Sequence, residues 1–144
     1  MSSTLPVVGD LRLDTIRSFR DARGILFPAE LPSLSGFAPV RIFWVADVPV
    51  GMARGQHGHR LCAQYLICCA GSILVEVFDG QDERSFALKP GQAVLLRPGL
   101  YATETFETPD ALLLVLCDKP FDADDYLDSR EEVQRFRAEV SSQS

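Results

Sequence analysis

The stretch that decides the fold runs from Gly51 to Gly71 and reads GMARGQHGHRLCAQYLICCAG. It holds both histidines of the 144-residue chain, His57 and His59, with one residue between them. In an extended strand, residues i and i+2 point to the same face, about 7 Å apart along the chain. The two imidazoles would then share one face, where they could bind a metal ion, transfer protons or simply pack in a core strand.

Short apolar segments separated by turn residues surround this stretch. Strands are expected at residues 40–47, 61–71, 73–80, 83–88, 93–99, 101–108 and 111–118. Between two of them, Asp79-Gly80 is typical of a hairpin turn. Six or more short strands with frequent turns predict an all-β sandwich or barrel.

The C-terminal part has a different pattern. Residues 121–140, FDADDYLDSREEVQRFRAEV, place acidic side chains early and arginines late. This order complements the dipole of a helix, which is positive at its N-terminus. The segment therefore predicts a helical turn near Asp122–Leu127 and a helix near Ser129–Val140.

Length and charge limit the domain organisation and the kinds of partner. A chain of this length is expected to form one domain, 1–144, with a core over about 19–118 and a helical tail at 119–144. The net charge is −6, and residues 118–144 account for −4 of it with 8 acidic and 4 basic side chains. Such a chain argues against nucleic-acid binding, but its nearly balanced remainder leaves room for a cationic pocket that suits a small anion.

No segment predicts a membrane anchor or a secretion signal. No apolar run approaches the ~20 residues that span a bilayer. Residues 1–14, MSSTLPVVGDLRLD, lack the basic and then apolar pattern of a signal peptide. We therefore expect a cytoplasmic protein without membrane association.

The cysteines predict no structural metal site. The chain has four of them, Cys62, Cys68, Cys69 and Cys117, and none forms a C-x-x-C pair. All four lie in apolar runs, so buried and reduced thiols are the expected state. A zinc site is not indicated by these spacings.

The spacing of five residues in the opening stretch resembles a known motif. The first motif of the cupin superfamily, G-x5-H-x-H-x3,4-E-x6-G, is similar to the pattern formed by Gly51, His57, His59, Gln64 and Gly71. Gln64 stands where the acidic metal ligand would be. The second cupin motif, G-x5-P-x-G-x2-H, has only a rough counterpart in residues 91–102, which contain no histidine.

This resemblance implies a cupin jelly-roll barrel, all-β with a short C-terminal helix, that lacks two of the four usual metal ligands. A neutral amide is a much weaker ligand than a carboxylate for zinc, iron or manganese. We therefore expect no bound metal and no other cofactor. Imidazole without a metal is a good acid–base catalyst near neutral pH, because its unperturbed pKa lies close by.

A narrower resemblance covers most of residues 19–136. Residues 39–80 are similar to the sugar 3,4-ketoisomerase family of cupins, the WxcM-like group, which typically reads R-V-Y-Y-I, then R-G-x-H-A-H-K, then Q-x-L. The similarity extends to the family's D-x-R-G-x-L opening, its P-P-x-x-W-H segment and its D-Y-I ending. The matching stretches are FRDARGILFPAE (19–30), AVLLRPGLYATETF (93–106) and LLLVLCDKPFDADDYL (112–127).

The family resemblance implies an isomerase that acts on a dTDP-linked 4-keto-6-deoxyhexose in deoxysugar biosynthesis. A base removes the proton at C3, an enediol forms, and a proton returns at C4 so that the carbonyl lies at C3. The family's acid–base pair corresponds to His57 and His59. The expected partner is thus a dTDP-linked keto-deoxysugar.

The charges of such a substrate indicate further binding residues. The enediolate oxygen needs hydrogen-bond donors, for which Arg23, Arg54 and Gln64 are candidates. The diphosphate needs cations, and Arg54 is the first candidate, followed by Arg41 and Arg97.

Two departures from the family pattern keep other functions open. Phe43-Trp44 replaces two tyrosines, and these residues with Tyr101 are candidates for stacking on the base and ribose. Tyr101-Ala102 stands where the family has W-H, which removes a polar group. One alternative is a cupin that binds a sugar nucleotide or another small anion without turnover, and another is a metal-dependent cupin enzyme.

Sheet edges predict self-association. A small jelly roll has exposed edges, which proteins tend to cover. The family resemblance implies a homodimer, often with an N-terminal strand exchanged between subunits. Residues 4–13, TLPVVGDLRL, are expected to supply such an edge strand.

Overall fold

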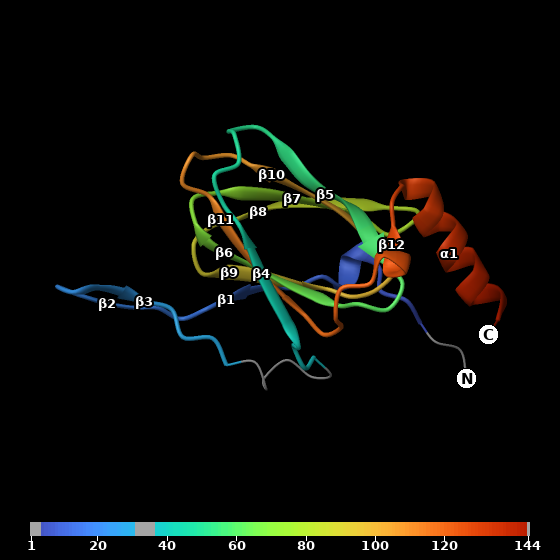
Figure 1. Cartoon of the computed structure of the whole chain (residues 1–144), viewed down its shortest axis with the longest axis horizontal. Helices are drawn as coiled ribbons and strands as arrows, with labels where there is room; N and C mark the ends of the chain where they lie inside the picture. The colour runs from blue at the N-terminus through green and yellow to red at the C-terminus, as the bar shows by residue number, and fades with distance from the viewer. Residues whose placement is uncertain (1–3, 31–36, 144) are drawn as a thin grey trace.

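Two five-stranded antiparallel sheets face each other in the computed structural model, which describes residues 4–30 and 37–143 (Figure 1). The first sheet has the order β1 (Leu13–Thr15), β9 (Gln92–Leu96), β6 (Gln64–Ala70), β11 (Leu112–Cys117) and β4 (Arg41–Val45). The second has the order β12 (Tyr126–Leu127), β5 (Ala53–His59), β10 (Tyr101–Phe106), β7 (Ile73–Phe78) and β8 (Glu83–Leu88). This architecture confirms the expected all-β class. Both ends of the expected domain, residues 1 and 144, lie outside the described residues.

The core lies between the two sheets and follows from the alternation of apolar residues. In β7, the side chains of Ile73, Val75 and Val77 are fully buried, and the two residues between them are half-buried. Val94 of β9 and Val115 of β11 meet them from the other sheet in the same cluster. Burying one such side chain contributes roughly 1.5–3 kcal/mol, so this alternation fixes which face of each strand points inward.

The strand expected at residues 61–71 is shorter than predicted and begins at Gln64. The backbone N–H groups of Leu61 and Cys62 donate to the carboxylate of Asp125, at 2.6 and 3.3 Å, instead of to a neighbouring strand. A side chain far along the chain therefore holds residues 60–63 in a turn. The local apolar pattern carries no information about this partner, which is why it extends the strand too far.

The C-terminal segment agrees with the sequence pattern. A 3₁₀ turn, η3, spans Ala123–Asp125, and α1 spans Arg130–Ser142. The Ser129 side chain caps α1 by accepting a hydrogen bond from the backbone N–H of Glu132 at 3.1 Å. The helix lies beside β12 at one end of the sheets (Figure 1). In the described part of the chain, no helix is both long and apolar enough to cross a membrane.

The N-terminal segment corrects one expectation. Residues 4–13 do not form an edge strand but include a 3₁₀ turn, η1 (Val8–Asp10), and the strand at the edge is the short β1, which pairs with β9 of the same chain. Val8 and Leu11 are buried in the core between the sheets. The Val8 N–H donates to the Asp79 carboxylate at 2.9 Å, which holds the turn in place.

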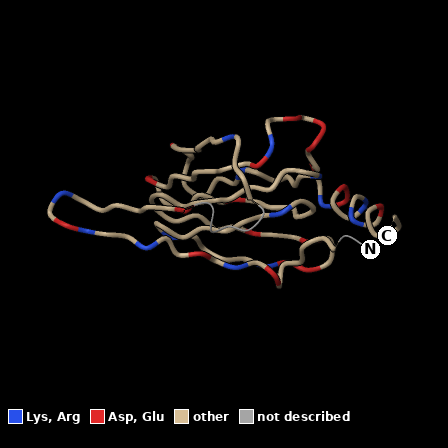
Figure 2. Tube along the Cα trace, turned by 90° about the horizontal axis from the view of Figure 1, so that it is seen from below, with Lys and Arg blue, Asp and Glu red and all other residues tan. Residues whose placement is uncertain are grey.

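A hairpin of β2 (Phe19–Asp21) and β3 (Gly24–Leu26) extends away from the two sheets (Figure 1). Its far end is charged, as Figure 2 shows. Both strands are exposed along their whole length. The side chains of the hairpin strands are therefore not buried in the core of their own chain.

The cysteines meet the expectation only in part. Cys62, Cys68 and Cys117 are buried, whereas Cys69 is exposed. Cys68 and Cys69 are neighbours in β6, so their side chains point to opposite faces of the sheet. Cys69 lies on the outer face of β6, one residue before the strand ends at Ala70.

Candidate active site

A β-bulge in β5 precedes the histidine pair. His57 lies opposite Ala102 of β10, and Gly55 lies opposite the next residue, Thr103, so that Gln56 is the extra residue. Gly55 and Gln56 both have positive φ values, 81° and 58°. An extra residue changes the face that the following side chains occupy, and bulges of this kind are frequent next to active sites.

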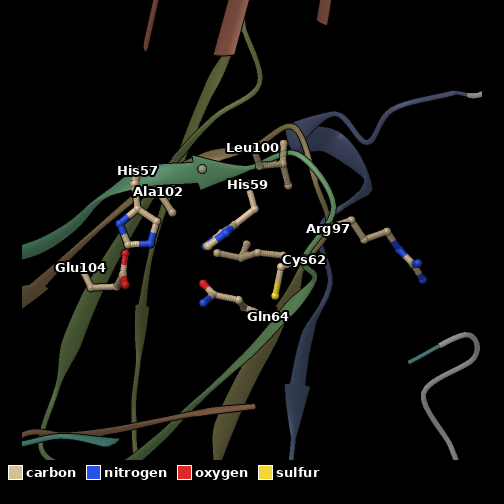
Figure 3. A pocket seen from close by; sticks show the side chains of 10 residues that line it. His57, His59, Cys62, Gln64, Arg97, Leu100, Ala102 and Glu104 are labelled. Atoms are coloured by element: carbon tan, nitrogen blue, oxygen red, sulfur yellow. The ribbon is translucent and has the colours of Figure 1, made fainter. Parts of the chain in front are cut away.

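The two imidazole rings lie side by side at one cavity (Figure 3), as the spacing of the histidines predicts. The ring centroids of His57 and His59 are 5.1 Å apart, with the planes perpendicular. Tyr126 of β12 contacts both rings, at centroid distances of 4.9 Å from His57 and 4.6 Å from His59. With 7% of its surface exposed, His59 is the more deeply buried of the pair.

Hydrogen bonds assign the tautomer of each ring. His57 Nδ1 lies 2.9 Å from the carbonyl oxygen of Gly55, and His59 Nδ1 lies 2.9 Å from Oδ2 of Asp125. These oxygens are acceptors, so each Nδ1 carries the proton and each neutral ring has its lone pair on Nε2. Nε2 of His59 is buried and has no hydrogen-bond partner among the described residues, which leaves it free for a ligand.

Burial lowers the pKa of both histidines. For His57, desolvation outweighs the hydrogen bond to Gly55 and the charge of Asp128, both of which raise the pKa. For His59, desolvation is again the largest cause, the hydrogen bond to Asp125 opposes it, and the neighbouring His57 lowers the pKa further. Because both values lie below the ordinary 6.5, both rings are neutral at pH 7 and can accept a proton.

Asp125 is a site residue that the sequence pattern did not reveal. Its buried carboxylate accepts three hydrogen bonds, from His59 Nδ1 and from the backbone N–H groups of Leu61 and Cys62. It stands 66 residues after His59 in a run of acidic residues, so no local signal distinguishes it from its neighbours. Asp125 orients the imidazole of His59 and would stabilise its protonated form.

Arg60 holds the segment that carries Asp125 in place through three hydrogen bonds. Its guanidinium donates from Nη1 to the backbone carbonyls of Asp124 at 2.9 Å and Tyr126 at 2.7 Å. Its backbone N–H donates to the carbonyl of Asp125 at 2.9 Å. Arg60 therefore positions the partner of His59, and its side chain faces away from the cavity as the strand alternation predicts.

The cavity is narrow in this structure, with a free volume of about 10 Å³, which is about the room that one water molecule needs. Gln64 lines it, and the Gln64 side chain is fixed by donating Nε2–H to Sγ of Cys117 at 3.5 Å. Glu104 lines it too, on the same face of β10 as Ala102, and it was not among the residues predicted from the sequence.

Three of the residues predicted to bind substrate, Arg41, Phe43 and Arg54, lie near the cavity. Arg41 of β4 places its guanidinium carbon 4.9 Å from the ring centroid of Phe43 and 5.4 Å from that of Phe121. Its charge contributes to the lowered pKa of His59. Arg54 is exposed on β5, opposite Glu104 of β10.

Other predicted residues are placed elsewhere. Arg97 is at the rim, but its guanidinium points away from the cavity (Figure 3). Tyr101 faces the outside of the second sheet, where the guanidinium of Arg130 lies 5.9 Å from its ring centroid. Trp44 is 67% exposed on the outer face of β4, and Arg23 lies in the projecting hairpin, paired with Asp21. The described structure of one chain does not bring Tyr101, Trp44 or Arg23 to this cavity.

One group of possible metal ligands occurs within the described residues. It consists of His59, Cys62 and Asp125, whose ligand atoms all lie within 4.8 Å of one another. Asp125 already accepts three hydrogen bonds there, and Nδ1 of His59 carries a proton. These donors therefore fit proton transfer better than a metal centre.

Gly58, between the two histidines, packs against the backbone of another segment. A Cβ on Gly58 would lie 2.4 Å from the carbonyl oxygen of Leu100 and 3.4 Å from Cγ2 of Val133. We expect Gly58→Ala to lower the free energy of unfolding by about 1–3 kcal/mol, the usual cost of overpacking, and to reduce turnover because β5 must shift. Chemical denaturation and activity assays measure both effects.

The matched control for this variant is Gly9→Ala, because a Cβ on Gly9 would have no atom within 4 Å. We expect Gly9→Ala to leave the unfolding free energy nearly unchanged. Equal stability of Gly58→Ala and the parent protein would contradict the close approach of Leu100.

Comparisons with known proteins agree with this geometry. Residues 9–139 match the family model FdtA, described as WxcM-like, C-terminal. A TDP-4-oxo-6-deoxy-α-D-glucose-3,4-oxoisomerase of Aneurinibacillus thermoaerophilus is 25% identical over 122 residues, which cover 84% of this chain and 88% of the relative.

Solved structures show the same fold. The sugar 3,4-ketoisomerase QdtA of Thermoanaerobacterium thermosaccharolyticum, in complex with TDP, is similar with a TM-score of 0.82 at 23% identity, covering 95% of this chain and 98% of that one. A 3,4-ketoisomerase of Helicobacter canadensis has a TM-score of 0.81 at 25% identity, covering 92% and 98%. The family match spans strand β5, which carries both histidines, and the segment that carries Asp125. The chain therefore belongs to the FdtA family of WxcM-like proteins.

Proposed function

We propose that this protein is a sugar-nucleotide 3,4-ketoisomerase that acts on a dTDP-linked 4-keto-6-deoxyhexose without a metal. The observation that carries the proposal is the pair of neutral imidazoles at one cavity, each with Nδ1 engaged and its lone pair on Nε2. Membership of the FdtA family and the activity named for the curated relative support this substrate class.

The histidine pair moves the carbon-bound proton. One Nε2 takes the proton from C3, and the electron pair of the C3–H bond becomes the C3=C4 double bond of an enediol. The pair then delivers a proton to C4, which leaves the carbonyl at C3. General acid–base catalysis of this kind contributes about 10²–10⁴-fold to the rate.

Neighbouring groups tune this chemistry. Burial keeps the rings neutral and able to act as bases. When His59 takes up a proton, the Asp125 carboxylate 2.9 Å from Nδ1 stabilises the imidazolium. We assign the diphosphate to Arg41 and Arg54, which supply positive charge near the cavity, and a stacking role to Phe43.

Incubation with dTDP-4-keto-6-deoxyglucose in heavy water, followed by proton NMR, tests the function. Exchange of the C3 proton together with a 3-keto product, in the presence of a chelator, supports the proposal. Binding without exchange would instead identify a non-catalytic cupin. Activity that the chelator abolishes would identify a metal-dependent enzyme.

We also propose that the protein is a homodimer in which the β2–β3 hairpin packs on a second copy of the chain. Phe19 and Leu26 face each other in the hairpin and are 50% and 63% exposed. Exposed apolar side chains on a projecting hairpin favour a protein partner. Exchange of this hairpin is favoured over exchange of residues 4–13, which are partly buried in their own core. Arg23 at its end would then lie against the partner.

The double variant Phe19→Ser/Leu26→Ser is expected to shift the dimer toward monomer at micromolar concentration, because it removes two apolar contacts of the interface. Light scattering after size-exclusion chromatography measures the mass. Val50→Ser, another exposed apolar residue, is the matched control and should remain dimeric. A double variant that stays fully dimeric would contradict the role of the hairpin.

A further inference from the structure

Strand β10 presents a third proton-carrying side chain to the histidine cavity. Ala102 and Phe106 are buried on its inner face, and Glu104 lies between them on the same face. In Figure 3 the Glu104 carboxyl points toward the His57 ring, and Gln64 lines the same cavity. Glu104 and Ala102 therefore line the cavity from the same face of β10.

The carboxyl group of Glu104 is closely packed, yet no residue in the described part of the chain makes a hydrogen bond to it. A Cβ on Gly55 would lie 2.6 Å from its Oε2, so the glycine of the bulge makes room for it. Its register partner on β5 is Arg54, and its partner on β7 is the fully buried Val75. Within residues 4–30 and 37–143, no hydrogen bond ends on this carboxyl group, which leaves both oxygens available to a ligand.

The ionisable groups around Glu104 come from few elements. From β5, Arg54 lies opposite it and His57 lies beside it in the cavity, where His59 is the next ring. Cys62, in the turn after β5, and Arg97, after β9, line the same cavity, and the guanidinium of Arg97 points away from it. Burial raises the pKa of Glu104 to about 7, against the opposing charge of Arg54, so that both its acid and its carboxylate form are populated near neutral pH.

The proposed reaction has to move two hydrogens, and the histidines account for one. C3 begins with a hydrogen and a hydroxyl group and ends as a ketone, while C4 undergoes the reverse change. The carbon-bound proton passes from C3 to C4. The oxygen-bound proton must also leave O3 and arrive at O4, and a carboxyl group can donate from one oxygen while its other oxygen accepts.

We propose that Glu104 is a catalytic residue that carries this oxygen-bound proton, an inference that rests on the proposed isomerase function. In the first half, the histidine base breaks the C3–H bond, the carboxylic acid gives its proton to O4, and the C4=O π pair becomes the O4–H bond. In the second half, the Glu104 carboxylate takes the proton from O3, the C3=O bond forms, and C4 receives its hydrogen. The acid is regenerated and no oxidant is needed.

The variant Glu104→Gln tests this role, because an amide keeps the shape and can hydrogen-bond but cannot release and recover a proton. We expect kcat for the 3-keto product to fall by about 100-fold or more, with KM changed less than threefold. The parent enzyme should lose activity as the pH rises through about 7, because the acid form starts the cycle. This alkaline limb should be absent from the residual activity of Glu104→Gln.

The matched control is Glu76→Gln, the same change on the outer face of the neighbouring strand β7. We expect it to keep the activity and pH profile of the parent protein. A Glu104→Gln protein with parental kcat and an unchanged alkaline limb would overturn the role of Glu104 while leaving the isomerase intact. A parent protein that never exchanges the C3 proton would overturn the proposed function itself.

A second variant keeps the test decisive if Glu104→Gln does not fold. Arg54 is exposed, and its charge lowers the pKa of Glu104. Arg54→Gln is therefore expected to move the alkaline limb of kcat to higher pH, whatever its effect on KM. An alkaline limb that stays in place in Arg54→Gln would contradict the assignment of that limb to Glu104.

Discussion

Replacing His59 with asparagine is expected to reduce turnover by about 10²–10⁴-fold and to leave the fold intact. The Nδ2 of asparagine takes the position of the histidine Nδ1, so it can still donate to the Asp125 carboxylate. What the variant lacks is Nε2, the buried atom that has no partner among the described residues. Loss of the general base accounts for the size of the effect. Deuterium incorporation at C3 in heavy water measures it directly.

The companion variant His57→Asn keeps the donor to the Gly55 carbonyl and should cause a similar loss. The pH profile gives an independent check. Both histidine pKa values lie below 6.5, so the base should be neutral at pH 7, and the acid limb of the parent enzyme should appear as the pH falls below that ordinary value. Normal C3 exchange in either variant would contradict the assignment of the two bases.

The second large effect is expected for Asp125→Asn, with a loss of about 10²–10⁴-fold in kcat. An amide can turn its NH₂ group toward Nδ1 of His59 and so favour the tautomer with the proton on Nε2, which is no longer a base. The same side chain loses one carboxylate oxygen that accepts the N–H of Leu61 or Cys62. Nitrogen NMR of the imidazole identifies the tautomer, and steady-state kinetics give kcat.

Asp124→Asn is the matched control, because the Asp124 side chain is exposed and the hydrogen bonds of this residue to Arg60 and Asp122 use its backbone carbonyl and N–H. We expect that variant to behave like the parent protein. An Asp125→Asn enzyme within tenfold of the parent rate, with the parent tautomer at His59, would contradict the positioning role.

The sequence was informative where the physical cause is local. Alternation of apolar residues predicts most of the strands, because the pleat repeats every two residues and one face is buried. The same periodicity places His57 and His59 on one face, which the ring distance of 5.1 Å confirms. The acidic and then basic order of residues 121–140 likewise predicts the C-terminal helix.

What could not be predicted depends on pairings between distant segments. Asp125 reaches His59, and Glu104 reaches the cavity, because β12 and β10 pair with β5 in a particular register, and no local pattern encodes a register. Tyr101 points to the opposite face of β10 from Ala102 and Glu104. The sequence alone does not tell which of these two faces lies inside, because that depends on how β10 pairs with its neighbours. The predicted strand at residues 61–71 begins too early for the same reason, because the backbone N–H groups of Leu61 and Cys62 donate to Asp125 and not to a neighbouring strand.

The hydrogen bond between His59 and Asp125 also has a consequence for the order of synthesis. Asp125 is synthesised 66 residues after His59, and the strands from β4 to β11 all precede it in the chain. The nascent polypeptide thus acquires a sheet framework before it acquires an oriented base. A chain that is truncated after residue 120 would therefore hold the His59 imidazole without the carboxylate that orients it.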